Sequence, residues 1–245
     1  MRLLLLALLV CAAAARVITL IGDAPTDGAV FDSLIARLQG AVQDGGTGLK
    51  AARPGADWMI LHYGWRGVAV SRALSKAVFH GRGSRLVLRF YAHSDFSCGV
   101  SVDADPMYTA SINRSGGAVE ITVPLSFGKH YAEVWPTDGD MWLVAGGFVG
   151  DGVTVHDWTG PDIGLPGEDL EGDLVLLVVA EDSVPEGYVE SVARLTERPL
   201  IVVILRDGRK AETAAAVCRL AERCALADFR NGEVDMFEAA VKWLV

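Results

Sequence analysis

The sequence predicts an α/β fold, with a mostly parallel sheet in three layers, helices on both faces, and a β-rich antiparallel insertion. Continuous apolar runs at residues 17–21, 174–179 and 200–205 are typical of strands that are buried on both faces. Segments with helical spacing of apolar residues separate these runs, and this alternation favours parallel strands with helical crossovers. Between about residues 58 and 148 the rhythm changes to short alternating runs with turn residues between them, which predicts antiparallel pairing.

The N-terminal part contributes one strand and one helix to this scheme. The run at residues 17–21 ends at Gly22, and a loop continues to Gly28. Apolar residues then recur three and four positions apart from residue 29 to 42, as on the buried face of a helix. Residues 43–56 are rich in Gly, Ala and Pro and predict a loop.

The middle part is predicted to be mainly antiparallel. Residues 58–65 and 68–80 read as a strand and a helix, and shorter strands follow from residue 85 onward. The segment Pro136–Asp140 has the composition of a hairpin turn.

Alternating strands and helices return after residue 150. Strands are predicted at 153–156, 174–179, 200–205 and 225–228, and helices at 185–196, 211–224 and 234–244. Each strand is followed closely by a helix or a short loop, so these strands are expected to lie parallel in one sheet.

Bulk composition limits the function. The chain has 245 residues, half of them apolar, which suits one large domain with an insertion. Its net charge of −9 disfavours a nucleic-acid partner, because phosphate contacts need clustered Lys and Arg. The acidic balance instead indicates a self-repelling chain without a basic surface for membranes.

The four cysteines and the N-terminus point to different compartments. Cys218 and Cys224 lie six apart in the predicted helix and would occupy different faces, so no bond is expected between them. The odd cysteine count left after removal of residues 1–15 favours a reducing, intracellular compartment. However, residues 1–15 form an apolar run that ends in small residues, and this segment is either a secretory signal peptide or a buried helix. It is too short to span a bilayer.

One four-residue motif adds a family resemblance. Asp157-Trp158-Thr159-Gly160 follows one predicted strand and precedes another, and this order resembles the P-loop GTPase superfamily over about residues 16–42 and 150–245. The resemblance implies a GTPase-like α/β domain over residues 16–245, interrupted by the β-rich insertion at about 58–148. The positions that would match the family's nucleotide site are Gly22, Asp27, Gly28, Asp157, Gly160, Arg206 and Asp207.

The chemistry at most of these positions differs from the family pattern. A P-loop reads Gly-x-x-x-x-Gly-Lys-Ser/Thr, whereas Gly22 and Gly28 are six apart, no lysine follows, and Asp27 would repel phosphate. The base-reading motif is also lost around Arg206 and Asp207. The resemblance therefore implies a degenerate, non-catalytic GTPase-like scaffold or assembly subunit without cofactor. Its protein partners would bind the exposed face of the insertion and the apolar N-terminal segment.

Two alternatives stay open. One is a divergent GTP- or ATP-binding hydrolase with magnesium, in which Arg206 or Lys210 replaces the P-loop lysine. The other is a secreted binding module that reads its ligand with the β-rich segment. Trp135, Trp142 and Trp158 could then form a partner surface or a sugar platform, although aromatic residues in short strands usually belong to the core.

Overall fold

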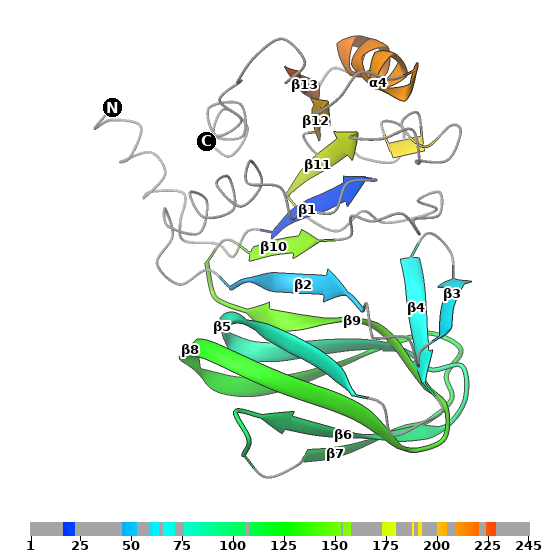
Figure 1. Ribbon diagram of the computed structural model, residues 1–245, viewed down its shortest axis with the longest axis vertical. Helices are drawn as coiled ribbons and strands as arrows, with labels where there is room; N and C mark the ends of the chain where they lie inside the picture. Colours follow the sequence, from blue (N-terminus) through cyan, green and yellow to red (C-terminus); the bar gives the residue numbers. More distant parts are fainter. Residues whose placement is uncertain are drawn as a thin grey trace. The chain divides into compact units, whose positions relative to one another are not determined.

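The computed structural model describes residues 17–22, 46–52, 59–63, 66–71, 76–105, 108–152, 154–157, 173–179, 188, 191–192, 200–204, 209–220 and 224–228. The chain divides into two compact units. Unit 1 comprises Met1–Asp44 together with Asp151–Val245, and unit 2 comprises Gly45–Gly150. Figure 1 labels the helix and the strands.

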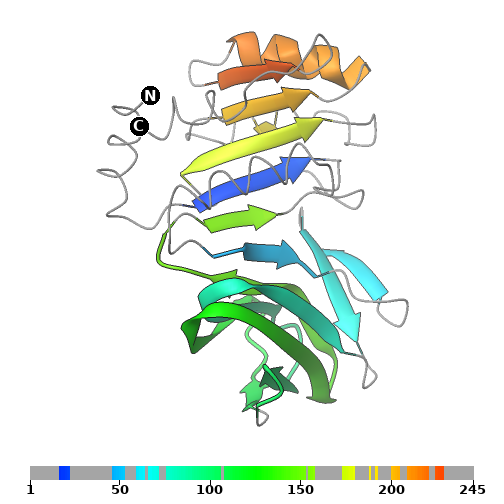
Figure 2. The same cartoon turned by 60° about the vertical axis from the view of Figure 1, so that its left-hand side comes forward.

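Unit 1 contains five parallel strands. They are β1 (Val17–Gly22), β10 (Thr154–Asp157), β11 (Leu174–Val179), β12 (Leu200–Ile204) and β13 (Cys224–Asp228). β1 pairs with β10 on one side and β11 on the other, and β12 and β13 continue beyond β11 (Figure 2). The predicted parallel pairing of the runs at 17–21 and 174–179 is thus confirmed. Residues 174–177 are completely buried, as expected for an apolar strand inside a sheet.

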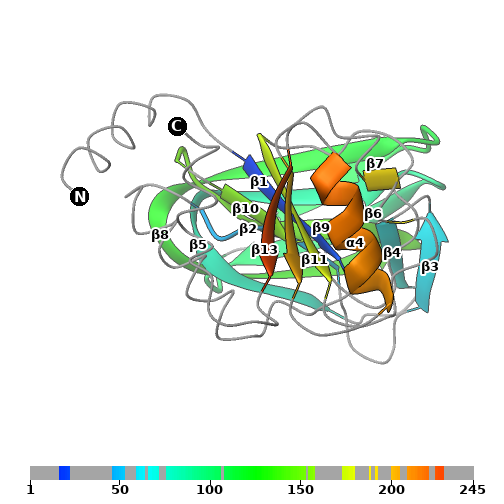
Figure 3. The same cartoon turned by 90° about the horizontal axis from the view of Figure 1, so that it is seen from above.

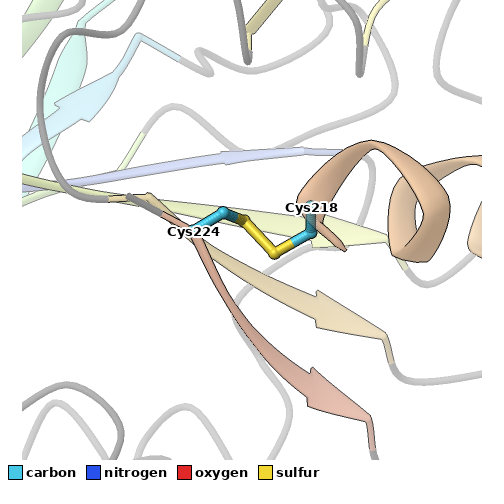
Figure 4. The surroundings of a disulfide bond; sticks show 2 residues. All are labelled: Cys218 and Cys224. Atoms are coloured by element: carbon cyan, nitrogen blue, oxygen red, sulfur yellow. A yellow bond between two sulfur atoms is a disulfide. The ribbon is translucent and has the colours of Figure 1, made fainter. Parts of the chain in front are cut away.

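Helix α4 (Arg209–Leu220) covers one face of these strands (Figure 3). Its buried residues Ala211, Ala214, Ala215 and Cys218 recur at helical spacing. The helix ends at Leu220, and Cys224 begins β13, so the two cysteines do not share a helix. Their Cα atoms lie 5.2 Å apart and a disulfide joins them (Figure 4). The expectation that Cys218 and Cys224 cannot bond is therefore wrong, because the helix was predicted to run four residues too far.

Unit 2 is built from eight antiparallel strands. They are β2 (Gly48–Ala51), β3 (Met59–Tyr63), β4 (Arg66–Ser71), β5 (Ala77–Tyr91), β6 (Phe96–Val102), β7 (Tyr108–Ile112), β8 (Ala118–Asp138) and β9 (Met141–Val149). β5 pairs with β8 over nearly its whole length, and β6 and β7 extend the sheet beyond β8. β9 pairs with the second half of β5 and also with β2 and β4.

The long strands β5 and β8 allow unit 2 to form two layers around one core. The pairing register shifts between Gly83 and Arg85, so the side chains that point inward change parity along β5. Ala77 and Phe79 are buried before the shift, and Leu86, Leu88 and Phe90 after it. These residues join inward-facing side chains of β6, β7, β8 and β9 in one hydrophobic cluster, which makes unit 2 a β-sandwich.

The β8–β9 hairpin confirms the predicted turn. β8 ends at Asp138 and β9 begins at Met141, so two residues form the loop. Gly139 has a φ of 71°, a left-handed conformation that other residues adopt with strain.

The predicted fold class is wrong. Most of the described strands are antiparallel and belong to a β-sandwich, whereas a three-layer, P-loop-GTPase-like, mostly parallel sheet was expected. The predicted helix at 68–80 is also wrong, because that segment supplies the end of β4 and the start of β5. The register shift in β5 explains part of the error: it interrupts the alternation that identifies a strand, so one 15-residue strand reads as separate short elements.

Candidate functional site

One face of unit 2 carries a row of polar and aromatic side chains outside the core, which we call the outer strip. Direct cross-strand neighbours in β5 and β8 share a face of the sheet, and three such pairs point away from the core. Lys76, one residue before β5, adds a fourth position beside Trp135. The outer strip consists of Lys76, Val78, His80 and Arg82 from the β5 side and of Lys129, Tyr131, Glu133 and Trp135 from β8.

The indole of Trp135 lies over the backbone of Gly99. The two residues are cross-strand partners in β8 and β6. A Cβ atom placed on Gly99 would come within 2.6 Å of Trp135 Cε2 and 2.8 Å of its Nε1. Glycine is therefore required at position 99 for the ring to lie there. The Trp135 residue stays half-buried, so part of its ring surface is open to solvent.

Charged and hydroxyl groups surround this indole. Lys76 Nζ stands 5.0 Å from the Trp135 ring centroid and 2.5 Å from Glu133 Oε2. Tyr131 donates its hydroxyl to Glu133 Oε1, and the Tyr131 ring lies 4.9 Å from that of His80. Donation from Lys76, and then from Tyr131, lowers the pKa of the Glu133 carboxyl group, while accepting this carboxylate's partner role raises the pKa of Tyr131. Glu133 is thus ionised at neutral pH and acts only as an acceptor.

A second polar pair closes one end of the sandwich. His130 Nδ1 lies 2.6 Å from Asp103 Oδ2, and Nε2 lies 2.7 Å from the Ser126 carbonyl oxygen. Asp103 also accepts from the Tyr131 backbone N–H at 2.9 Å. Burial is the largest effect on the pKa of His130 and lowers it, but the hydrogen bonds to Asp103 and Ser126 together outweigh burial and raise the pKa. The same bond to His130, followed by that to Tyr131, lowers the pKa of Asp103.

We expect this pair to make the stability of unit 2 depend on pH. The contribution of His130 is fully present below its unfolded pKa of 6.5 and is lost as the pH rises through the higher folded value. The contribution of Asp103 is present above 3.8 and is lost as the pH falls through the lower folded value. Denaturant unfolding across this range should therefore show the pair's stabilisation between these two limits. The variant His130→Gln should lose this dependence and His80→Gln should keep it; equal profiles for wild type and His130→Gln would contradict the assignment.

The described residues supply hydrogen-bonding groups but no assembled nucleophile. Within the described part of unit 2, none of His80, His93 and His130 is hydrogen-bonded to a serine hydroxyl or a thiol, and both ring nitrogens of His130 are already engaged. The free thiol of Cys98 is buried, and burial raises its pKa to about 11, so it stays protonated. Among the described residues, no three His, Cys, Asp or Glu side chains gather to bind a metal ion.

The structure describes two of the seven predicted nucleotide-site positions. Gly22 ends β1 with a φ of 133°, and Asp157 ends the neighbouring parallel strand β10, so both lie at the carboxyl edge of the unit 1 strands. Asp27, Gly28, Gly160, Arg206 and Asp207 lie outside the described residues. Their role, and the absence of a cofactor, stay predictions.

The three tryptophans suggested as a platform occupy different settings. Trp135 belongs to the outer strip. Trp142 packs its ring 4.5 Å from His93 and 6.4 Å from Tyr91, in an aromatic cluster of its own. Trp158 lies outside the described residues. The sequence could not single out Trp135, because the glycine beneath it is 36 positions away and is placed by strand register.

Comparisons with known proteins give one similarity over the whole chain. A solved structure of a peptidoglycan O-acetylesterase matches 97% of this chain and 86% of its own, at 16% identity and a TM-score of 0.58. A family two carbohydrate esterase from Cellvibrio japonicus matches 80% of this chain at 11% identity and a TM-score of 0.32. A carbohydrate-binding module from Cellvibrio mixtus lichenase 5A matches 41% at 17% identity and a TM-score of 0.32. The last two scores are too low to support an argument. No family model and no curated protein matches the sequence.

The similarity corrects the family resemblance. This chain shares its fold with the O-acetylesterase structure over nearly its full length, including unit 2, and the resemblance to P-loop GTPases is wrong. Parallel apolar strands with an acidic residue at a strand end occur in several α/β folds, and they do not identify one family. The predicted role as a GTPase-like scaffold therefore loses its basis.

Of the residues described, none belongs to a helix with the length and hydropathy needed to cross a membrane. The cysteine argument for a reducing compartment also fails. Cys218 and Cys224 are bonded to each other, and Cys98 is the free thiol among the described cysteines.

Proposed function

We propose that this protein binds carbohydrate through the outer strip of unit 2. The observation that carries the proposal is the Trp135 indole, which lies flat over Gly99 beside ionised and hydroxyl side chains. An aromatic face offers an apolar surface to the C–H groups of a sugar ring, and polar neighbours bind the hydroxyl groups at its rim. The whole-chain likeness to a peptidoglycan O-acetylesterase structure supports this class of ligand.

The polar groups beside Trp135 complement a sugar. Glu133 accepts hydrogen bonds from hydroxyl groups, and the ammonium of Lys76 donates to them. Lys76 stands over the ring in the free protein, but its side chain is 48% exposed and its long stem can swing aside. Its ammonium group then remains within reach of the sugar.

We favour binding over turnover. The O-acetylesterase likeness also includes unit 1, so ester hydrolysis on a carbohydrate is the second candidate. A serine hydrolase pairs its nucleophile with a histidine, and unit 1 contains a single histidine, His156. His156 lies in β10 and is only 6% exposed. Release of acetate from O-acetylated peptidoglycan, lost in His156→Gln, would favour hydrolysis instead.

The Trp135→Ala variant tests the proposal. On an array of neutral and charged glycans that includes peptidoglycan fragments, we expect the wild-type protein to bind, with affinities then measured by calorimetry. Loss of the indole should weaken binding by about 30-fold, the effect of removing a tryptophan worth roughly 2 kcal/mol at the centre of an interface.

Tyr108→Ala is the matched control. Tyr108 is 55% exposed, but it pairs with the buried Val100 and so lies on the opposite face from Trp135. Its removal should leave binding unchanged. A folded wild-type protein that binds no glycan, or a Trp135→Ala variant that binds as well as wild type, would refute the proposal.

We also propose that the protein works in an oxidising compartment outside the cytoplasm. The disulfide between Cys218 and Cys224 supports this location, because such bonds persist where thiols are not continuously reduced. Alkylation of the natural protein without reductant should leave both cysteines unlabelled, and labelling of both would contradict the proposal.

A further inference from the structure

Two cations face each other at the end of the outer strip that is remote from Trp135. Arg82 and Lys129 are direct cross-strand partners in β5 and β8, and both are exposed. Like charges placed directly opposite each other destabilise a sheet. The arrangement therefore carries a cost in the free protein that a bound anion would remove.

Neither cation is neutralised by the surrounding structure. Within the described residues, Arg82 and Lys129 form no ion pair, and the nearby carboxylates are engaged elsewhere. Glu133 is bonded to Lys76, and Asp103 is bonded to His130. The guanidinium carbon of Arg82 rests 4.6 Å from the ring centroid of Phe127, which holds this group on the outer face.

The local charge is opposite to that of the whole chain. The outer strip has three cationic side chains and one carboxylate, whereas the protein has a net charge of −9. A positive strip on an acidic protein gives selective attraction for an anionic ligand.

The geometry also sets the shape of the ligand. Trp135 and Lys129 lie six residues apart on one face of β8, a span of about 20 Å at the usual strand rise. His80, Tyr131 and Glu133 line the surface between them. An extended chain of several sugar rings fits this length, with a ring over the indole and an acidic group at the cationic pair.

We infer that the ligand of the outer strip is a linear polysaccharide that carries carboxylate groups, with Trp135 as its apolar anchor and Arg82 with Lys129 as its anion site. This inference rests on the proposed function and adds the class of ligand. It requires no metal and no covalent step.

The experiment compares charged glycans with neutral counterparts of the same linkage. Polygalacturonate, alginate, hyaluronan and peptidoglycan strands are each tested beside their carboxyl-reduced forms by calorimetry. We expect at least one charged glycan to bind about tenfold more tightly than its reduced form. This preference should disappear when the ionic strength rises from about 0.01 M to about 1 M, because the Debye length falls from about 30 Å to 3 Å.

The double variant Arg82→Gln/Lys129→Gln should bind the charged and the reduced glycan equally. The double variant Lys50→Gln/Arg114→Gln removes the same charge from exposed positions outside the outer strip and should keep the preference. If reduced glycans bind as well as charged ones and Trp135→Ala still weakens binding, the inference fails and the proposed function stands. If no glycan of either kind binds, both fail.

Discussion

Replacing Gly99 by valine should abolish glycan binding while unit 2 stays folded. The new Cβ atom would lie within 2.8 Å of three atoms of the Trp135 indole, a distance that no van der Waals contact tolerates. The indole is the end of a side chain that can rotate, so we expect it to leave the sheet rather than to disrupt the strands. Binding should then weaken by about 30-fold, as for loss of the indole itself.

Calorimetric titration of Gly99→Val with the glycan that wild type binds, together with a denaturation curve, checks this expectation. Gly117→Ala is the matched control, because the nearest atom to its new Cβ lies 4.0 Å away. Retained binding by a folded Gly99→Val variant would show that the position of the indole does not matter.

A second glycine should decide whether unit 2 folds. In Gly147→Ala the new Cβ would lie 2.0 Å from the carbonyl oxygen of Gly48 and 3.1 Å from Leu49 Cα. These are backbone atoms of the paired strand β2, and they cannot yield without breaking the β2–β9 ladder. We expect a loss of about 3 kcal/mol or more in the free energy of unfolding, at the upper end of the range for overpacked cores.

Urea unfolding followed by circular dichroism measures this loss, again beside Gly117→Ala, which should unfold like wild type. A Gly147→Ala variant with unchanged stability would mean that β2 and β9 are not packed at this distance.

The sequence predicted the parallel strands of unit 1 better than the sandwich of unit 2. The runs at 174–179 and 200–205 are apolar without interruption, and burial on both faces is a local property that such runs report. Helix α4 was also recognised, but its end was not, since nothing between Leu220 and Cys224 breaks helical spacing. That four-residue error hid the disulfide.

The sandwich and the candidate site depend on contacts between residues far apart in sequence. The inward-facing parity of β5 changes at Gly83, so neither half shows a long alternating pattern. The position of Trp135 over Gly99 and the pairing of Arg82 with Lys129 both follow from strand register, which a single sequence does not reveal. Composition identified the tryptophans as candidates, but only register separated Trp135 from Trp142.

Strand β5 ties the two layers of the sandwich into one cooperative body. Its 15 residues hydrogen-bond to β8 along nearly their full length and to β9 over the second half, so each layer includes part of the same strand. Neither layer can be cut out and survive alone, because either cut would take half of β5 from its partner. The glycan-binding surface and the hydrophobic interior should consequently melt together, in a single transition.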